Sequence, residues 1–504
     1  MINHLKTKNH EDALKLFESE NTEMTPKLTS VWAQKNAEAD LQNKLDEQLV
    51  RIMVRQNVST CFFDDKDLQE LVKLAFPGLK IYSRLHFTRS VIPRMAGEIR
   101  TNIVKQIGSN NFSITSDGWM KPSKFPALLS VTTHTISDDF QRMDNVIATI
   151  EILSEHTGEE IARLIENFLV ENGLSIGSIV ACVRDDARNM QKSCRLLGID
   201  SFQCSAHMYH LSVRDALRCN SRITNLIAKL SQEQSTASAY IPTAKKILLF
   251  LRERRCRNAD VQMISENLAE NLQVRLAAIE SNKILRLSML VDPRFAFDEN
   301  FLLGFEWEIL EDEFIHLIIR EKDSVSTTTV AGASTAEFDD QEFAEVGIDP
   351  LDEDSMDIDL WARDVRSPSA LSQKSTDSQR ELKSAYKAEF NLFRHGIIRL
   401  GRDENVFEWW SNNKFRFPLI AVGAKRFLSV PATSVSSERT FSMAGLLYAN
   451  TLRNRLGAKM AENLMLIKAS LKKTMLAPSV EPVDDELDNK EEIEENVLLQ
   501  QQID

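Results

Sequence analysis

The stretch N-F-S-I-T-S-D-G-W, residues 111–119, marks a change in the chain from helical to strand-like periodicity. It predicts a strand that ends at Asp117 and Gly118, because both residue types are common where strands turn. The stretch P-A-L-L-S-V-T-T-H-T-I follows at residues 126–136, and its alternation predicts a second strand. Residues 145–153 predict a third. The three strands are spaced for antiparallel pairing.

A helix and a buried strand come next. Thr157 and Glu160 form a capping box ahead of an apolar stripe, and Gly173 ends that helix. Residues 179–183 are a short apolar run, which is typical of a strand buried on both faces. The run leads into V-R-D-D-A-R-N-M, which contains Asp185. We expect another strand at 202–204 and a helix at about 206–217.

The resulting β-β-β-α-β-α order is that of the ribonuclease-H-like fold, and predicts a mixed α/β class. In that order the first and fourth strands lie side by side at the centre of the sheet. Asp117 and Asp185 would then be neighbours, and two nearby carboxylates raise each other's pKa unless a cation neutralises them. The pair suggests a site for Mg²⁺ or Mn²⁺, which prefer oxygen ligands. Two ordinary turn residues remain the alternative.

Composition indicates a multidomain globular protein. The chain has 504 residues, of which 43% are hydrophobic, so two or three domains are expected. Residues 337–359 carry eleven acidic side chains and no basic one, and 481–504 carry ten acidic side chains and one lysine. We expect both segments to be disordered. The remainder is mildly basic, which is compatible with nucleic acid as a partner.

The cysteines and the hydropathy indicate an intracellular protein. The six cysteines contain no C-x-x-C pair, so reduced thiols are expected. No run of some eighteen apolar residues and no signal-peptide pattern is found, so we expect no membrane partner.

The stretch at residues 430–471 combines a helix start, a carboxylate and an apolar stripe. Thr433, Ser434, Ser436 and Ser437 are residue types that cap helices, and Glu438 with Arg439 follows them. A stripe at helical spacing comes later, at Leu464, Ile467 and Leu471. Taken alone, this pattern is typical of a capped surface helix with an ordinary glutamate.

Six motifs, taken together and in order, resemble the hAT superfamily of transposases, in particular the zinc finger BED domain-containing proteins. The motifs are S-I-T-S-D-G-W at Asp117, V-R-D-D-A-R-N-M at Asp185, C-S-A-H at Cys204 to His207, L-V-D-P-R-F at Asp292, W-W-S-N-N, and P-A-T-S-V-S-S-E-R-T-F-S at Glu438. The resemblance implies a ribonuclease-H-like core interrupted by a large helical insertion, and a C-terminal dimerisation region.

The resemblance also implies roles for particular residues. Asp117, Asp185 and Glu438 match the family's D-D-E ligands for Mg²⁺ or Mn²⁺, with Asp185 chosen over Asp186. Two metal ions would support DNA cleavage and strand transfer. We expect Cys204, His207 and Arg439 to support the site or contact DNA, and a plainly packed His207 remains open. The stripe Leu464, Ile467 and Leu471 would serve both the core and dimerisation.

The first ten residues resemble the end of a BED finger. His4 and His10 are spaced as half of a zinc site, and Zn²⁺ binding would require a cysteine pair upstream of them. Two chance histidines are the alternative.

Two functions follow from the resemblance. One is a nuclear transposase-like enzyme that acts as a homodimer or higher oligomer on DNA, at terminal inverted repeats or genomic sites. The other is a domesticated, catalytically silent nuclear protein that binds DNA and regulates transcription. The expected division of the chain is a BED remnant (1–12), an N-terminal helical DNA-binding or oligomerisation region (13–106), the first part of the core (107–221), a helical insertion (222–400) with an acidic loop (324–381), the second part of the core with the dimerisation region (401–475), and an acidic tail (476–504).

Overall fold

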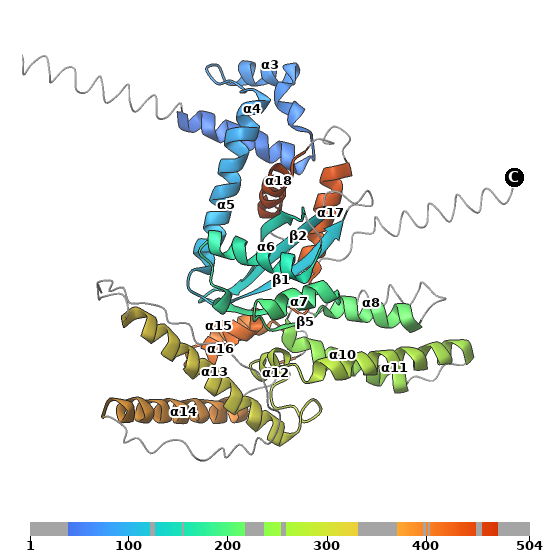
Figure 1. Ribbon diagram of the computed structural model, residues 1–504, viewed down its shortest axis with the longest axis vertical. Helices are drawn as coiled ribbons and strands as arrows, with labels where there is room; N and C mark the ends of the chain where they lie inside the picture. The colour runs from blue at the N-terminus through green and yellow to red at the C-terminus, as the bar shows by residue number, and fades with distance from the viewer. Residues whose placement is uncertain are drawn as a thin grey trace, which may run out of the picture.

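One five-stranded mixed sheet lies at the centre of the molecule. The computed structural model describes residues 39–120, 127–153, 156–216, 236–253, 259–330, 370–396, 400–401, 404–449 and 456–471. The strand order is β3-β2-β1-β4-β5 (Figure 1). The strands are β1 (Phe112–Met120), β2 (Ala127–Ile136), β3 (Arg142–Glu151), β4 (Ile179–Arg184) and β5 (Ser201–Gln203). The fold is therefore mixed α/β.

The pairing of the central strands agrees with the expectation from the sequence. β1 is antiparallel to β2 and parallel to β4, so the first and fourth strands are neighbours. One correction concerns the end of β1. The strand does not stop at Asp117, because antiparallel pairing with β2 continues to Met120, opposite Ala127. Only the β4 side of β1 ends near Asp117.

Helices cover both faces of the sheet. All ten residues of β2 are buried, which requires cover on both sides. On one face, α17 (Val435–Ala449) and α18 (Ala458–Leu471) pack against β1, β2 and β3. The other face carries Cys182, which contacts Cys194 of α7 (Arg188–Leu196). Helix α6 (Gly158–Glu171) packs on α7 and begins at the predicted cap, where Thr157 Oγ1 accepts a hydrogen bond from Glu160 N at 3.3 Å.

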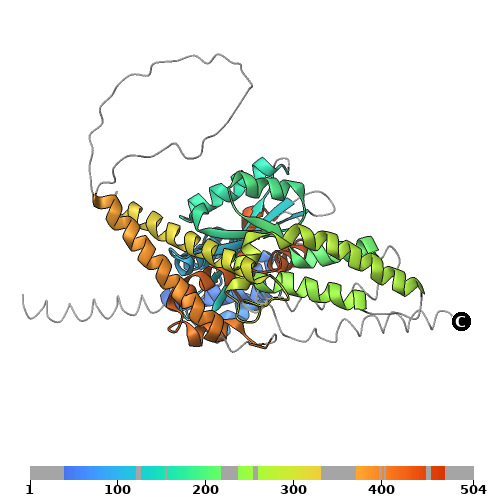
Figure 2. The same cartoon turned by 90° about the horizontal axis from the view of Figure 1, so that it is seen from below.

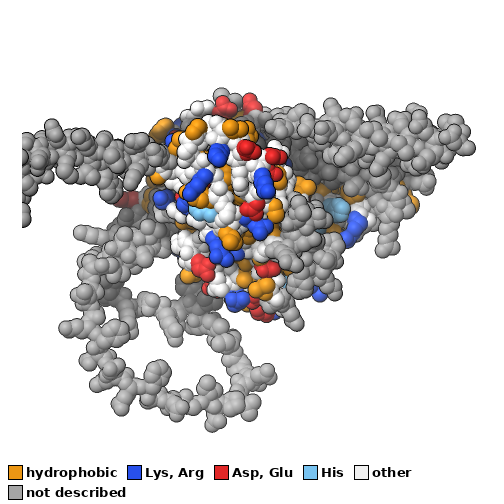
Figure 3. Space-filling view, turned by 90° about the horizontal axis from the view of Figure 1, so that it is seen from above, with side chains coloured by type: hydrophobic (Ala, Val, Ile, Leu, Met, Phe, Trp, Pro, Cys, Tyr) orange, Lys and Arg blue, Asp and Glu red, His pale blue; other side chains and the backbone are white. Residues whose placement is uncertain are grey.

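An N-terminal helical region stands at one end of the sheet. Residues 39–55 are helical and are followed by η2 (Thr60–Asp64), α3 (Lys66–Ala75), α4 (Arg84–His86), η3 (Phe87–Val91) and α5 (Ile92–Ile107). Helix α3 ends before Pro77, and Gly78 adopts a φ of 103°, which favours glycine. Seen from this end, basic, acidic and hydrophobic side chains are interspersed (Figure 3).

Helices α8 to α14 lie on the side of the sheet away from the N-terminal region and include two projecting pairs. The elements are α8 (Ser205–Ala216), η5 (Ala237–Ala239), α10 (Tyr240–Glu253), α11 (Ala259–Glu280), α12 (Lys283–Leu290), α13 (Gly304–Val330) and α14 (Ala370–Gly396). Helices α10 and α11 lie side by side, as do α13 and α14, and the two pairs extend in different directions (Figure 2). Helix α11 ends at Glu280, and Asn282 caps the next helix, α12, by accepting from Leu285 N.

The chain then returns to the sheet through α15 (Val406–Asn413) and α16 (Pro418–Leu428). Trp410 anchors this return: it is fully buried and its Nε1 donates to Val291 O at 2.9 Å. The tandem tryptophans therefore include a core residue. The cysteines that the structure describes, Cys61, Cys182, Cys194 and Cys204, are free thiols, as expected. No described helix combines the length and hydrophobicity that spanning a bilayer requires.

Candidate active site

Two carboxylates lie next to each other where β1 and β4 run side by side. Thr115 pairs with Val183 in the parallel register. Two residues further along each strand, this register places Asp117 beside Asp185, and neighbouring strands are about 4.8 Å apart. Asp185 lies directly after β4, and its Oδ1 accepts a hydrogen bond from Ala187 N at 3.1 Å. The predicted closeness of the two aspartates therefore follows from the strand pairing.

Hydroxyl groups fasten the start of α17 to the same face of β1. The Oγ atoms of Ser436 and Ser437 each lie 2.9 Å from Thr115 Oγ1. Thr115 precedes Asp117 by two residues, so both side chains are on one face of the strand. Glu438 comes directly after Ser437, in the first turn of α17, and is exposed. The serines therefore bring Glu438 to the face that carries Asp117.

The segment before α17 is held by backbone hydrogen bonds to the helices beyond the sheet. Ala432 O accepts from Ser205 N at 3.0 Å, and Val430 O accepts from Ala237 N at 3.0 Å. Both carbonyls are buried, and an unpaired buried carbonyl would be destabilising. These two bonds fix the path of the chain as it approaches α17.

The charges of Asp185 and Glu438 affect Asp117. Burial raises the pKa of Asp117 to about 7, Asp185 and Glu438 raise it as well, and the hydrogen bond from Gly118 N at 2.8 Å opposes them. Asp117 therefore takes up a proton far more readily than an ordinary aspartate. Asp185, and not its neighbour Asp186, exerts this effect. Asp186 is exposed and accepts from Gln191 Nε2 at 3.1 Å.

The repulsion between the carboxylates favours a divalent cation, but the placement of the side chains does not form a complete ligand set. Mutually repelling carboxylates are stabilised when a cation lies between them. Yet among the residues that the structure describes, no group of three or more His, Cys, Asp or Glu side chains is placed to hold a metal ion. Mg²⁺ is commonly held by one or two carboxylates together with waters and substrate phosphates. The donor set offered here is the pair Asp117 and Asp185.

Cys204, His207 and Arg439, which we expected to support the site or contact DNA, differ in their exposure to solvent. Cys204 has no exposed surface, and its Sγ accepts from Ser434 N at 3.2 Å, so it holds the approach to α17 and has no access to DNA. Burial also raises the pKa of the Cys204 thiol. His207 is partly exposed in the first turn of α8. Arg439 is partly exposed on α17, beside Glu438.

The apolar stripe of α18 lies inside the chain's own core. Leu464 and Ile467 are 2% and 1% exposed and pack in the cluster that contains the sheet, and Leu471 packs at its margin. Helix α18 lies against β3 and α5. The stripe thus serves the core, and a dimer contact through Leu464 or Ile467 would require α18 to leave the sheet.

Several predictions concern residues outside the described ranges. These are His4 and His10 with the BED remnant (1–12), most of the acidic loop and the acidic tail (476–504).

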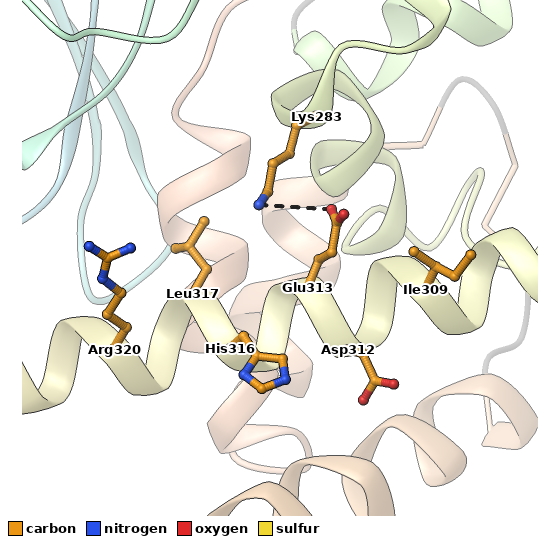
Figure 4. Close-up of a pocket in the computed structure, with 7 residues that line it drawn as sticks. All are labelled: Lys283, Ile309, Asp312, Glu313, His316, Leu317 and Arg320. Atoms are coloured by element: carbon orange, nitrogen blue, oxygen red, sulfur yellow. Dashed lines mark ion pairs between the residues drawn. The ribbon is translucent and has the colours of Figure 1, made fainter. Parts of the chain in front are cut away.

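Three cavities among the described residues are lined by none of the three carboxylates. A cavity of about 490 Å³ runs along α13, where Lys283 Nζ faces Glu313 Oε2 at 3.9 Å (Figure 4). Acidic and basic side chains alternate in it, so it favours no ligand charge. Its lining residues are Lys283, Ile309, Asp312, Glu313, His316, Leu317 and Arg320. We therefore place the candidate chemistry where β1 and β4 end side by side, because Asp117 interacts there with Asp185 and Glu438.

The sequence analysis missed a polar network behind the carboxylates. Thr115 and Thr132 are buried on neighbouring strands, where they contact Ser436, and Thr132 also contacts His134. The sequence contained a signal for this network. Ser113 and Thr115 occupy alternate positions of a central strand, so their hydroxyl groups share one buried face, and buried hydroxyl groups require hydrogen-bond partners.

Residues 383–471 match the model of the hAT family C-terminal dimerisation region. The match supports hAT family membership. It spans the second half of α14 and all of α15 to α18, so it includes Glu438 and the buried stripe. It also supports a homodimer as the assembly. No curated protein matches the chain.

Proposed function

We propose that this chain is a hAT transposase-like DNA-binding protein that cleaves DNA and transfers the cut strand. Asp117, Asp185 and Glu438 form its reactive centre, on a ribonuclease-H-like core interrupted by a helical insertion. The strand order β3-β2-β1-β4-β5, with β2 antiparallel and β4 parallel to β1, supports that core. The matched dimerisation region supports the family.

One observation carries the proposal. Three carboxylates from distant parts of the chain approach one another closely enough that two of them raise the pKa of the third. A folded protein gains no stability from gathering like charges, so such clusters occur mainly at functional sites. The sequence context of all three matches the family's D-D-E pattern, as set out above.

The residues have distinct roles in this proposal. Asp117 and Asp185 would hold Mg²⁺ or Mn²⁺ together with DNA phosphate oxygens, and Glu438 would complete the set once DNA is bound. The ions supply activation of the attacking oxygen and charge stabilisation at the leaving oxygen. The two strands fix the aspartates, and the hydroxyl contacts of Ser436 and Ser437 with Thr115 fix Glu438.

DNA binding and a nuclear location belong to the same proposal. The mildly basic composition outside the two acidic segments supports a DNA partner. Two arginines of the N-terminal region are already engaged in ion pairs within the chain: Arg94 with Glu47 and Glu98, and Arg100 with Glu462. Zn²⁺ would enter only through a complete BED finger that includes His4 and His10.

The decisive experiment compares cleavage of a labelled terminal inverted repeat by wild type, Asp185→Asn and Asp186→Asn in Mn²⁺. The two variants change neighbouring aspartates, but only Asp185 interacts with Asp117. We expect Asp185→Asn to reduce nicking about 100-fold or more, because several kcal/mol of transition-state stabilisation are lost. Asp186→Asn should stay within about twofold of wild type. Equal nicking by all three proteins would refute the assignment.

A second outcome would identify the alternative function. If neither wild type nor variant cleaves, but all retain specific DNA in a mobility-shift assay, the chain is a DNA-binding protein without catalysis. That outcome leaves the fold and the dimer intact and removes the reactive centre.

The dimer surface must lie on exposed parts of the matched region. With Leu464 and Ile467 buried, the large apolar side chains exposed there include Leu392 (64% exposed) and Phe415 (86%). We expect Leu392→Asp combined with Phe415→Asp to shift elution on a sizing column toward monomer without loss of the folded circular-dichroism spectrum. An unchanged elution volume would place the contact elsewhere.

A further inference from the structure

A buried histidine–aspartate pair lies beneath the candidate site. His134 on β2 is 2% exposed, and its Nδ1 lies 2.5 Å from Asp144 Oδ1 on β3. Arg142 Nε donates to both oxygens of Asp144, at 3.0 and 3.1 Å. Asp144 is thus bonded to both His134 and Arg142.

The protonation of this pair follows from its neighbours. Burial alone would raise the pKa of Asp144, but Arg142 and His134 bring it to about 2, so Asp144 is ionised. Burial lowers the pKa of His134 and, with Arg142, outweighs the opposite effect of Asp144, so His134 is neutral at pH 7. An ionised carboxylate only accepts hydrogen bonds. His134 therefore carries its proton on Nδ1, and its Nε2 is an acceptor.

A chain of hydroxyls connects His134 with α17. His134 Nε2 lies 3.1 Å from Thr132 Oγ1, and Thr132 Oγ1 is 3.1 Å from Ser436 Oγ. Thr132 and Thr115 are also hydrogen-bonded to each other. Thr115 in turn contacts both Ser436 and Ser437.

The histidine tautomer sets the direction of every bond in this chain. A hydroxyl has one proton to donate, and Thr132 must donate it to His134 Nε2. Thr132 therefore accepts from Thr115, and Ser436, which has a single proton, donates it to either Thr132 or Thr115. When Thr115 donates to Thr132, it can only accept in its contacts with Ser436 and Ser437. Each proton thus points toward His134, and the serines of α17 act as the donors at the outer end.

We propose that His134 is a positioning residue, whose fixed tautomer orients the hydroxyl chain that seats the first turn of α17 and thereby Glu438. The seating of α17 stands on the contacts alone. The consequence for Glu438 rests on the proposed function, so the two are tested by separate measurements.

The first measurement is hydrogen–deuterium exchange of amides 437–441, with adjacent threonines as a matched pair. Thr132→Val removes the link to His134. Thr133→Val removes a buried hydroxyl that has no hydrogen-bond partner among the described residues. We expect Thr132→Val to speed exchange about tenfold, as expected for the loss of about one buried hydrogen bond. Thr133→Val should leave the rate unchanged, and Thr132→Ser should restore it. Equal rates in Thr132→Val and Thr133→Val would overturn the proposal.

The second measurement is the ¹⁵N NMR spectrum of the His134 ring. We expect a neutral ring with the proton on Nδ1 at pH 7, and a shift of the Nε2 signal in Thr132→Val that Thr132→Ser reverses. A general loss of stability would not produce this reversible shift. A proton on Nε2, or a charged ring, would overturn the proposal, because Thr132 would then have to accept.

The third measurement is the DNA-cleavage rate. Thr132→Val should lower kcat about tenfold and leave the KM for DNA unchanged, while Thr133→Val should alter neither. A changed KM, or equal rates in both variants, would remove the link to Glu438. If wild type does not cleave, the proposed function fails, while exchange and NMR still decide whether His134 seats α17.

Discussion

Asp117 on β1 and Asp144 on β3 are two carboxylates of one sheet whose pKa values move in opposite directions. The pKa of Asp117 is raised to about 7, and that of Asp144 is lowered to about 2. Burial acts on both in the same direction, upward. The difference lies in the neighbours: Asp117 faces Asp185 and Glu438, whereas Asp144 faces Arg142 and His134.

This contrast separates a structural carboxylate from a functional one. At another buried acid, Asp292, the fold supplies a cation of its own. Asp292 is fully buried, and it accepts from Arg294 Nη2 at 2.7 Å and from Ser238 Oγ at 2.5 Å. At Asp117 the neighbouring groups that affect its pKa are two further acids and one backbone N–H. A cluster that lowers stability in this way is expected where a sequence is selected for function.

The largest effect is expected at Asp144. Asp144→Asn leaves the Arg142 guanidinium, 9% exposed, without its buried counter-charge, and breaking such a pair costs about 3 kcal/mol. Urea unfolding at pH 7 should show this loss. Asp139→Asn is the control, because Asp139 is 83% exposed beside Lys414. A loss at Asp144 no larger than at Asp139 would show that the buried pair has no stabilising role.

Asp117→Asn should have the opposite sign. A pKa raised by about three units corresponds to at most about 4 kcal/mol at pH 8. Asp117 is partly exposed, so water screens this effect, and we expect a gain of about 2 kcal/mol without divalent metal ions. A raised folded-state pKa means that stability is present below about pH 4 and lost as the pH rises through 7. Asparagine removes that loss. The stabilities of variant and wild type should therefore converge toward pH 4. Thermal unfolding across this range measures the effect, with Asp186→Asn as the control.

Mn²⁺ should reduce the difference in stability between Asp117→Asn and wild type. A cation that binds only the folded wild type stabilises it in proportion to the logarithm of its concentration. If millimolar Mn²⁺ leaves the melting temperature of the wild type unchanged, the result would contradict the proposed metal site.

Much of the sheet was predictable because its signals are local. Alternation marked β2, and the capping pair Thr157–Glu160 marked α6. Helix α7 was missed because its buried face is Met190, Ser193 and Cys194, a spacing typical of a helix but with little apolar character. The boundary between α11 and α12 is hard to predict for a related reason. The apolar pattern continues through Asn282, where only the capping bond of that side chain starts a new helix.

The candidate site was predictable to different extents. Strand order alone placed Asp117 beside Asp185, because parallel neighbours share a register. Glu438 came only from the resemblance of its motif, since nothing local predicts that Ser436 and Ser437 bond to β1. Periodicity also identified the stripe of Leu464 and Ile467, but it cannot say whether such a stripe meets the same chain or a second copy. In the structure, Leu464 and Ile467 pack in the core of the same chain.

A smaller effect is expected from the pH dependence of His134. Burial lowers the pKa of His134 in the folded state. Below about pH 6.5 the unfolded chain therefore binds a proton at this histidine that the folded chain does not bind. Stability should therefore fall as the pH drops, by up to about 1.4 kcal/mol per pH unit from this group. His134→Gln should reduce that slope in urea titrations between pH 6.5 and 5. An unchanged slope would mean that His134 is charged in the folded protein, which contradicts the tautomer assigned to it.

The smallest effect is expected at Asp138, whose partners are also cationic. Its carboxylate lies 2.6 Å from Lys425 Nζ, which lowers its pKa just as Arg142 lowers that of Asp144. The side chain is 90% exposed, however, and water screens such a pair. Asp138→Asn should change the free energy of unfolding by about 0.5 kcal/mol or less, and added salt should reduce even that. A change as large as that of Asp144→Asn would show that the cationic partner, and not burial, decides how much an aspartate contributes to stability.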